Sequence, residues 1–248
     1  MKKVFSRPKA LEDRARSFCP GCTHGIVHRL IAELVDEFDL AEKAVIVLPV
    51  GCSTLSVDYF SIDSVQASHG RAPAVATGIK RALPQNFVLT YQGDGDLASI
   101  GTAEIVHSAT RGEKITVVFI NNGIYGMTGG QMAPTTLIGQ KTETSPYGRE
   151  PQREGYPIKI CEMLSVLNGP AYIARTAVIS PKTVNETKRA LRKAFKAQLN
   201  NLGFSLVEIL STCPTNWGLD PIESLKRVEE ETMKYYPLGE FKVTEGVV

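Results

Sequence analysis

The sequence has little net charge, few cysteines and no long hydrophobic run. Its 248 residues include 28 lysines and arginines against 26 aspartates and glutamates, which leaves a formal charge of +2. This balance excludes a protein dedicated to binding nucleic acid or an anionic membrane surface. No stretch reaches the roughly 18 apolar residues of a membrane span, and the charged first residues lack the apolar segment of a secretory signal. We therefore expect a cytoplasmic protein that binds neither nucleic acid nor membrane.

Five cysteines, an odd number, do not suit a disulfide framework in a chain that we expect to be cytoplasmic. Cys19 and Cys22 form a Cys-x-x-Cys pair, whereas Cys52 and Cys213 stand alone. The second Cys-x-x-Cys of a zinc ribbon is missing, and Thr23 follows Cys22 where c-type haem attachment needs histidine. From spacing alone, three interpretations stay open: a structural zinc, an iron–sulfur cluster, or unconnected buried thiols.

Short apolar runs alternate along the chain with stretches of helical period. Strands are predicted over residues 44–50, 87–92, 115–120, 171–178 and 204–209. Helices are predicted over residues 26–38, 72–83, 98–111 and 185–199. This alternation predicts βαβ units, and hence an α/β fold with a mostly parallel sheet and helices on both faces.

Two segments stand apart from this alternation. Residues 129–157 are rich in Gly, Pro, Thr and Gln and have no period, so we expect a functional lid or an interface arm. From Cys213 onward the chain has several prolines and one short helical segment. We therefore divide the chain into a principal domain, residues 1–212, and a C-terminal extension, residues 213–248.

Polar residues follow two of the predicted strands. Gly93-Asp94-Gly95-Asp96 ends one strand, and Asn121-Asn122 ends the next. The carboxyl ends of parallel strands meet at one edge of a sheet, so Asp94 and Asn122 can converge there. Carboxylate and amide oxygens suit Mg²⁺ bound with phosphate oxygens, and the glycines let backbone N–H groups approach a diphosphate. The alternative is a tight turn followed by an Asx turn. The dinucleotide pattern G-x-G-x-x-G is not satisfied.

The pairing of Gly-Asp-Gly with Asn-Asn resembles the signature of thiamine-diphosphate enzymes. This resemblance implies a thiamine-diphosphate-binding fold of the pyrophosphate-binding type in residues 1–212. It also implies that Mg²⁺ is bound by Asp94, Asn122 and the carbonyl of Ile124.

A longer series of motifs extends the resemblance from Ser17 to Trp217. In order, they are Cys-Pro-Gly-Cys, Gly-Cys-Ser, His-Gly-Arg, Gly-Asp-Gly-Asp, Asn-Asn-Gly-Ile-Tyr-Gly-Met-Thr-Gly-Gly-Gln, Pro-Thr-Thr and Cys-Pro-Thr-Asn-Trp. The series is similar to that of the β subunit of 2-oxoacid:ferredoxin oxidoreductases. The resemblance implies a [4Fe–4S] cluster on four cysteines: Cys19, Cys22, Cys52 and Cys213. Cys161 matches no motif and is interpreted as structural, and Thr23 departs from the glycine that many members have.

The resemblance also implies an activity, a set of contacts and partners. The activity is oxidative decarboxylation of a 2-oxoacid to acyl-CoA and CO₂, with thiamine diphosphate as cofactor and electrons passing through the cluster to ferredoxin. The glutamate that activates the cofactor is expected on an α subunit with a pyrimidine-type domain, so no catalytic residue is assigned in this chain. A small ferredoxin-like subunit is a further expected partner. The implied cofactor contacts are Val50, Gly51, Cys52, Ser53, His69, Gly93, Gly95, Asp96, Gly126 and Met127.

Several alternatives remain at this stage. A cluster-free thiamine-diphosphate decarboxylase or synthase subunit with a structural zinc is the second hypothesis, and a non-enzymatic metal-binding module is the third. The apolar Leu55 and Met127 favour a branched-chain 2-oxoacid, although 2-oxoglutarate enzymes share the motifs. His24, His28 and His107 are interpreted as residues of helical faces. A basic face on the predicted helix 185–199 is either a solvated surface or a docking site for an acidic ferredoxin.

Overall fold

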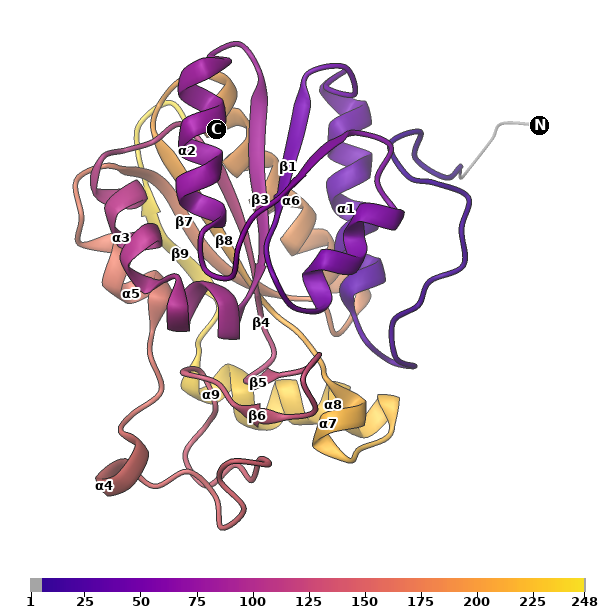
Figure 1. Cartoon of the computed structure of the whole chain (residues 1–248), viewed down its shortest axis with the longest axis vertical. Helices are drawn as coiled ribbons and strands as arrows, with labels where there is room; N and C mark the ends of the chain where they lie inside the picture. Colours follow the sequence, from indigo (N-terminus) through magenta and orange to yellow (C-terminus); the bar gives the residue numbers. More distant parts are fainter. Residues whose placement is uncertain (1–5, 248) are drawn as a thin grey trace.

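The computed structural model describes residues 6–247, which build a seven-stranded sheet between two layers of helices (Figure 1). The strand order is β2–β1–β3–β4–β8–β7–β9. Neighbouring strands are parallel except β9, which is antiparallel to β7. The strands are β1 (Ala44–Leu48), β2 (Asp63–Gln66), β3 (Phe87–Gly93), β4 (Thr116–Asn121), β7 (Pro170–Ala177), β8 (Phe204–Leu210) and β9 (Gly239–Val243). The predicted α/β fold with a mostly parallel sheet is confirmed.

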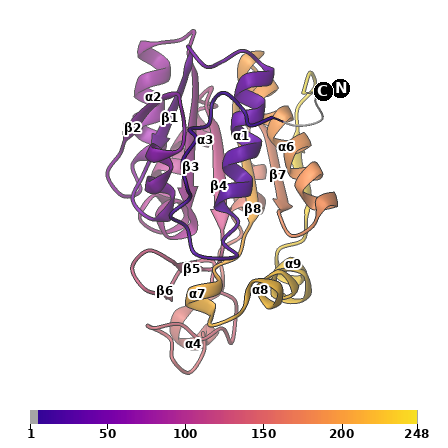
Figure 2. The same cartoon turned by 90° about the vertical axis from the view of Figure 1, so that its right-hand side faces the viewer.

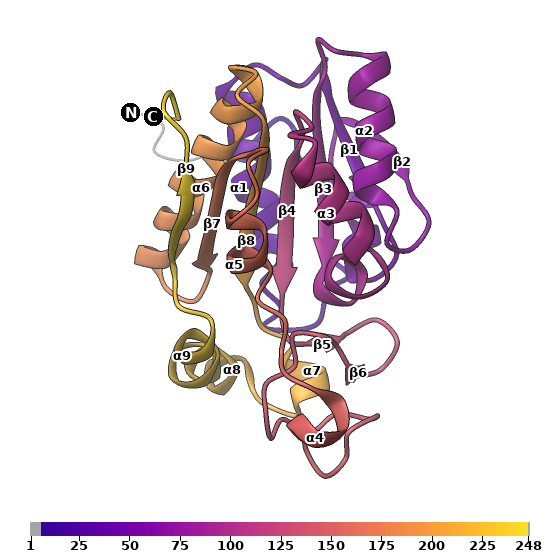
Figure 3. The same ribbon diagram turned by 90° about the vertical axis from the view of Figure 1, so that its left-hand side faces the viewer.

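Helices cover both faces of the sheet, as Figures 2 and 3 show from opposite sides. One face carries α1 (His24–Glu37) and α6 (Pro181–Leu199). The other carries α2 (Ala72–Ala82), α3 (Thr102–Thr110) and α5 (Ile160–Ser165). Successive side chains of a strand point to opposite faces. Most positions of a strand buried on both sides are therefore apolar, which explains the hydrophobic runs.

The predicted helices are present, with shifts at their ends. Helix α6 begins at Pro181 because Ser180 caps it: the Ser180 hydroxyl accepts a hydrogen bond from the backbone N–H of Thr183. The predicted helix 98–111 is broken into a π-helical turn, Asp96–Ile100, and α3. The break falls at Gly101, where a Cβ would lie 2.8 Å from a backbone oxygen of Gly70. Close contact between two backbones therefore interrupts the helix.

The structure also contains elements that the sequence analysis did not predict. Strand β2 is exposed along its whole length and polar, and β9 lies at the opposite edge of the sheet, so neither has a long apolar run. The tail holds more than the one predicted short helix. It contains α7 (Pro214–Trp217), α8 (Pro221–Arg227), η3 (Val228–Thr232) and α9 (Met233–Tyr235), and it ends in β9 of the main sheet.

The aperiodic segment 129–157 lies beyond the carboxyl ends of the strands, beside α7–α9 (Figures 1 and 3). It includes β6 (Gln131–Met132), which pairs with β5 (Ile124–Tyr125), and the short helix α4 (Pro151–Glu154). We call residues 129–157 the arm. Within residues 6–247, no helix is both long and apolar enough to span a bilayer.

The basic face of α6 is largely engaged within the chain. Ion pairs join three of its residues to neighbouring elements, Lys188 to Glu33 (2.6 Å), Arg192 to Glu37 (2.6 Å) and Lys193 to Glu240 (2.9 Å). Because they are partly exposed, each contributes little to stability. Their arrangement indicates that this face holds α6 against α1 and β9, which favours the interpretation as a solvated structural surface.

Two histidines on α1 are buried in the core, and they predict a dependence of stability on pH. Burial lowers the pKa of His24 to about 4, and burial, with His24 and Arg16, holds the pKa of His28 well below its usual range. Both rings are neutral in the folded chain but take up protons in the unfolded chain below about pH 6.5. The contribution of these two histidines to the free energy of unfolding should therefore be constant above neutrality and fall as the pH drops below 6.5, by up to about 1.4 kcal/mol per pH unit for each histidine.

Urea denaturation between pH 8 and pH 5 measures this effect. The variant His28→Gln should show a shallower decline than the wild type, whereas the exposed His107→Gln serves as a control with an unchanged slope. Parallel curves for wild type and His28→Gln would contradict the prediction.

Candidate functional site

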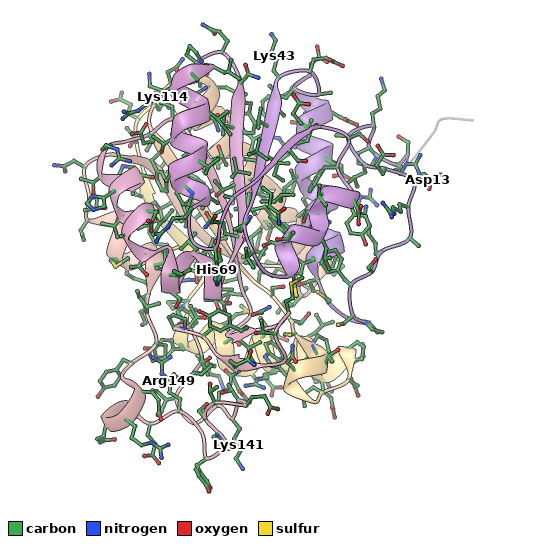
Figure 4. All side chains as sticks on the ribbon, viewed as in Figure 1. Asp13, Lys43, His69, Lys114, Lys141 and Arg149 are labelled. Carbon is green, nitrogen blue, oxygen red and sulfur yellow. The ribbon has the colours of Figure 1, made fainter. Side chains whose placement is uncertain are left out.

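A cavity opens at the carboxyl ends of β1, β3 and β4, and the loops that follow these strands form its walls. The structure brings every residue predicted to contact the cofactor to this wall: Val50, Gly51, Cys52, Ser53, His69, Gly93, Gly95, Asp96, Gly126 and Met127. The predicted magnesium ligands Asp94, Asn122 and Ile124 line the same cavity. Figure 4 shows His69 near the end of the sheet, on the side of the arm.

The Asp94 carboxylate is deeply buried in this wall, with 2% of the residue exposed. Its Oδ1 accepts a hydrogen bond from the backbone N–H of Gly95 at 2.8 Å. Its Oδ2 accepts from the N–H of Gly123 and from the hydroxyl of Thr135, both at 2.6 Å. Burial raises the pKa of Asp94 to about 6, although these donors oppose the shift. The carboxylate is thus fixed in position but incompletely compensated, as a cation ligand would be.

The turn after β4 presents the second oxygen ligand. The Asn122 side chain accepts a hydrogen bond from the backbone N–H of Ile124 at 3.2 Å, and Gly123 has a φ of +67°. The Asx turn left open by the sequence is therefore present. It leaves lone-pair capacity on the amide oxygen of Asn122, so the turn and a role in metal binding are compatible.

Asp96 is engaged by its own neighbours. It accepts hydrogen bonds from Nδ1 of His69 (2.6 Å), from the backbone N–H of Gly70 (2.6 Å) and from Nε2 of Gln92 (2.7 Å). These contacts occupy both carboxylate oxygens and fix the imidazole. The ring nitrogen of His69 that remains for other partners is Nε2, so Asp96 acts on the cavity mainly by orienting His69.

Four thiols gather beside the cavity. A Cβ added to Gly126 would lie 3.4 Å from Sγ of both Cys52 and Cys213, so these two sulfurs flank that glycine. Burial raises the pKa of Cys22 to about 12, and the thiols of Cys213, Cys52 and Cys19 raise it further. Burial also raises the pKa of Cys52 to about 11. Cysteines from three separate segments of the chain therefore lie near one another.

In residues 6–247, no group of three or more His, Cys, Asp or Glu side chains has the geometry to hold one metal ion. Cys161 lies elsewhere: it is fully buried, and its Sγ donates to Oε2 of Glu208 at 3.0 Å. Its surroundings agree with the structural role expected of it.

The structure adds residues to the site that the sequence analysis missed. His24, Ile120, Tyr125 and Thr128 also line the cavity, and Thr135 reaches Asp94 from the arm. The sequence analysis interprets His24 as a residue of a helical face, but it is the first residue of α1, two residues after Cys22. That position could have suggested its place at the site. Tyr125 and Thr128 lie within the Asn-Asn-Gly-Ile-Tyr-Gly-Met-Thr-Gly-Gly-Gln motif, which could have suggested their place at the site.

Comparison with known proteins identifies the class to which this fold and site belong. Residues 49–209 match the family model described as thiamine pyrophosphate enzyme, C-terminal TPP binding domain. The chain therefore carries a thiamine-diphosphate-binding domain.

Individual relatives narrow the assignment. The chain is 46% identical over 251 residues to ketoisovalerate oxidoreductase subunit VorA of Methanothermobacter thermautotrophicus, an alignment that covers 97% of this chain and 53% of that protein. It is 39% identical over 213 residues to 2-oxoglutarate synthase subunit KorB of Archaeoglobus fulgidus, covering 86% of this chain and 75% of that protein. The chain belongs to the family of 2-oxoacid:ferredoxin oxidoreductase subunits, and it spans about half the length of the ketoisovalerate oxidoreductase subunits it matches.

A solved structure shares the whole fold. The 2-oxoglutarate:ferredoxin oxidoreductase of Magnetococcus marinus, with 2-oxoglutarate, coenzyme A and succinyl-CoA bound, superposes with a TM-score of 0.78 at 26% sequence identity. The match covers 99% of this chain and 87% of the other. The similarity thus extends through the arm and the tail as well as the sheet.

The two glycines of the Gly-Asp-Gly segment should respond differently to the same substitution. A Cβ at Gly95 would lie 2.3 Å from the ring of Tyr125, whereas one at Gly93 has no atom within 4 Å. We expect Gly95→Ala to lower the free energy of unfolding by about 1–3 kcal/mol because the ring must shift. Gly93→Ala should change it by less than about 0.5 kcal/mol. Urea denaturation without cofactor measures both, and equal effects would show that Tyr125 does not constrain Gly95.

Proposed function

We propose that this chain is the β subunit of a 2-oxoacid:ferredoxin oxidoreductase, which oxidatively decarboxylates a 2-oxoacid to acyl-CoA and CO₂. The observation that carries this proposal is the position of two donor sets beside one another, one lining the cavity and the other next to it. Asp94 and Asn122 provide oxygen ligands, and the cysteines of three separate segments provide thiols. An oxygen set suits Mg²⁺ with a diphosphate, and thiolates suit an iron–sulfur cluster.

The cavity wall fits the diphosphate of thiamine diphosphate. The hydroxyl of Ser53 is buried and has no hydrogen-bond partner within the described residues, so it is available to a ligand. At Gly51 and Gly93, an added Cβ would meet nothing within 4 Å, which leaves the backbone accessible. In the proposed site, Asp94, Asn122 and the carbonyl of Ile124 bind Mg²⁺, and Nε2 of His69 faces the diphosphate.

Each thiolate of a [4Fe–4S] cluster binds a different iron, so a cluster beside this cofactor does not need the single-ion site that the described residues lack. Thiamine diphosphate supplies an electron sink for decarboxylation, and a [4Fe–4S] cluster supplies a one-electron acceptor. We assign the cluster to Cys19, Cys22, Cys52 and Cys213. The exposure of Cys19 supports transfer of electrons to an external ferredoxin, because electron-transfer partners must approach closely.

Exposed apolar residues at the mouth of the cavity favour contact with a partner subunit. Val50 and Met127 line the cavity, yet 43% and 46% of their surfaces are exposed. Apolar groups exposed at the rim of a site mark an interaction surface. We propose that an α subunit covers them and supplies the glutamate that activates the cofactor, and that a small ferredoxin-like subunit completes a cytoplasmic complex. Similarity to ketoisovalerate oxidoreductase subunits, together with the apolar Met127, supports a branched-chain 2-oxoacid as substrate.

The test of the proposal is metal analysis of the protein purified anaerobically with its α partner. We expect about four irons and four sulfides per chain and an EPR signal after reduction with dithionite. One zinc without sulfide would overturn the cluster assignment and indicate a non-oxidative thiamine enzyme.

A separate prediction concerns the proposed magnesium ligand Asp94. Asp94→Ala should abolish Mg²⁺-dependent binding of thiamine diphosphate, because the variant loses the only carboxylate of the proposed ligand set. Isothermal titration calorimetry with and without Mg²⁺ measures this, and Asp63→Ala on the exposed strand β2 is a matched control. Tight, Mg²⁺-dependent binding by Asp94→Ala would refute the assigned ligand.

A further inference from the structure

The Pro-Thr-Thr motif of the arm contacts the proposed magnesium site, which consists of Asp94, Asn122 and the carbonyl of Ile124, but the proposed function gives the motif no role. We infer that Thr135 and Thr136, held in place by Arg149, are positioning residues for the proposed magnesium site. This inference rests on the proposed function, because it concerns the same site.

The two threonines hold the two sides of the site. The hydroxyl of Thr135 donates to Oδ2 of Asp94 at 2.6 Å. The hydroxyl of Thr136 donates to the carbonyl of Gly123 at 2.6 Å and accepts from the backbone N–H of Ala133 at 2.9 Å. Both residues are buried, with exposures of 1% and 0%. One short segment therefore fixes the carboxylate after β3 and the turn after β4 relative to each other.

Arg149 in turn fixes this segment. Its Nη1 donates to the carbonyls of Pro134 (2.9 Å) and Thr136 (2.7 Å), on either side of Thr135. Its Nε and Nη2 donate to the carbonyls of Gly155 (2.9 Å) and Tyr156 (2.9 Å) at the far end of the arm. Figure 4 shows Arg149 in the arm, below His69. Only a guanidinium offers this many donors in a rigid plane, so the side chain joins two segments of the arm, residues 134–136 and 155–156.

A second contact supports the segment from the tail. The hydroxyl of Tyr236 lies 3.1 Å from the carbonyl oxygens of both Thr135 and Ile158, and its one O–H can donate to either of them. The Thr135 backbone is therefore held from the tail, while Arg149 holds its neighbours. A hydroxyl fixed in this way orients the Asp94 carboxylate, and groups that orient a metal ligand commonly contribute 10–100-fold to metal affinity.

The experiment uses the complex with its α partner, stripped of Mg²⁺ and cofactor with EDTA. Thiamine diphosphate is titrated at a series of fixed Mg²⁺ concentrations, and the apparent Kd is measured by calorimetry. Thr135→Val keeps the shape but removes the hydroxyl, and it should weaken Mg²⁺-dependent binding by about 10–100-fold. Thr135→Ser restores the hydroxyl and should bind within about threefold of wild type. Thr144→Val, which removes an exposed hydroxyl elsewhere in the arm, should bind as wild type does.

A second variant tests the role of Arg149. Arg149→Lys loses the planar set of donors, so it should weaken binding in the same direction as Thr135→Val. It should also increase hydrogen exchange of the backbone amides in residues 133–156, measured without cofactor. Unchanged exchange and unchanged affinity in this variant would overturn the role of Arg149.

The controls separate this inference from the function on which it rests. If wild type binds, Asp94→Ala does not, and Thr135→Val binds like wild type, the inference fails while the proposed function stands. If the wild type itself shows no Mg²⁺-dependent binding, the proposed function fails. Equal losses in Thr135→Ser and Thr135→Val would show that the hydroxyl is not the positioning group, and would also overturn the inference.

Discussion

The shared direction of four central strands is the constraint on which the rest of the molecule depends. Strands β1, β3, β4 and β8 are consecutive neighbours in the sheet and parallel, so the segments that follow them leave from the same edge. These segments carry, in order of the strands, Cys52, Asp94, Asn122 and Cys213. Residues that are far apart in the chain thus become neighbours without any long-range signal of their own. The arm and the tail then pack beyond the same edge of the sheet, at the carboxyl ends of these strands.

Two buried carboxylates show how differently the fold treats charge. Glu208 on β8 is fully buried, and the guanidinium of Arg175 and the amide of Asn121 both donate to it. The groups that hold Asp94 are instead uncharged N–H and O–H donors, and its pKa is raised to about 6. A buried carboxylate held only by neutral donors retains part of its desolvation cost. The first arrangement is a structural ion pair, whereas the second suits a ligand for a cation that arrives from outside the chain.

What the sequence predicted, and what it missed, follows from how local each signal is. Asp94 and Asn122 could be placed because each directly follows an apolar run that predicts a buried strand. The contact from Thr135 could not, because the arm has no hydrophobic period and its path back to β3 depends on Arg149 binding backbone carbonyls. Every residue has a backbone carbonyl, so the pattern of side chains cannot predict which carbonyls Arg149 contacts. Strands β2 and β9 were missed because both lie at edges of the sheet, where a strand can be short and exposed and needs no long apolar run.

The thiols illustrate how the fold assembles one site from distant segments. Gly21 has a φ of +78°, and its Cα packs so closely on α8 that a Cβ would lie 2.6 Å from Cβ of Pro221. The hydroxyl of Thr212 donates to the carbonyl of Gly21 at 2.7 Å. These contacts bring the Cys19–Cys22 loop to the segment of Cys213. Because burial raises the pKa of Cys22 and Cys213, keeping their thiolates requires a cation. Binding of the proposed cluster would then be coupled to the docking of this loop on the tail, since each lowers the cost of the other.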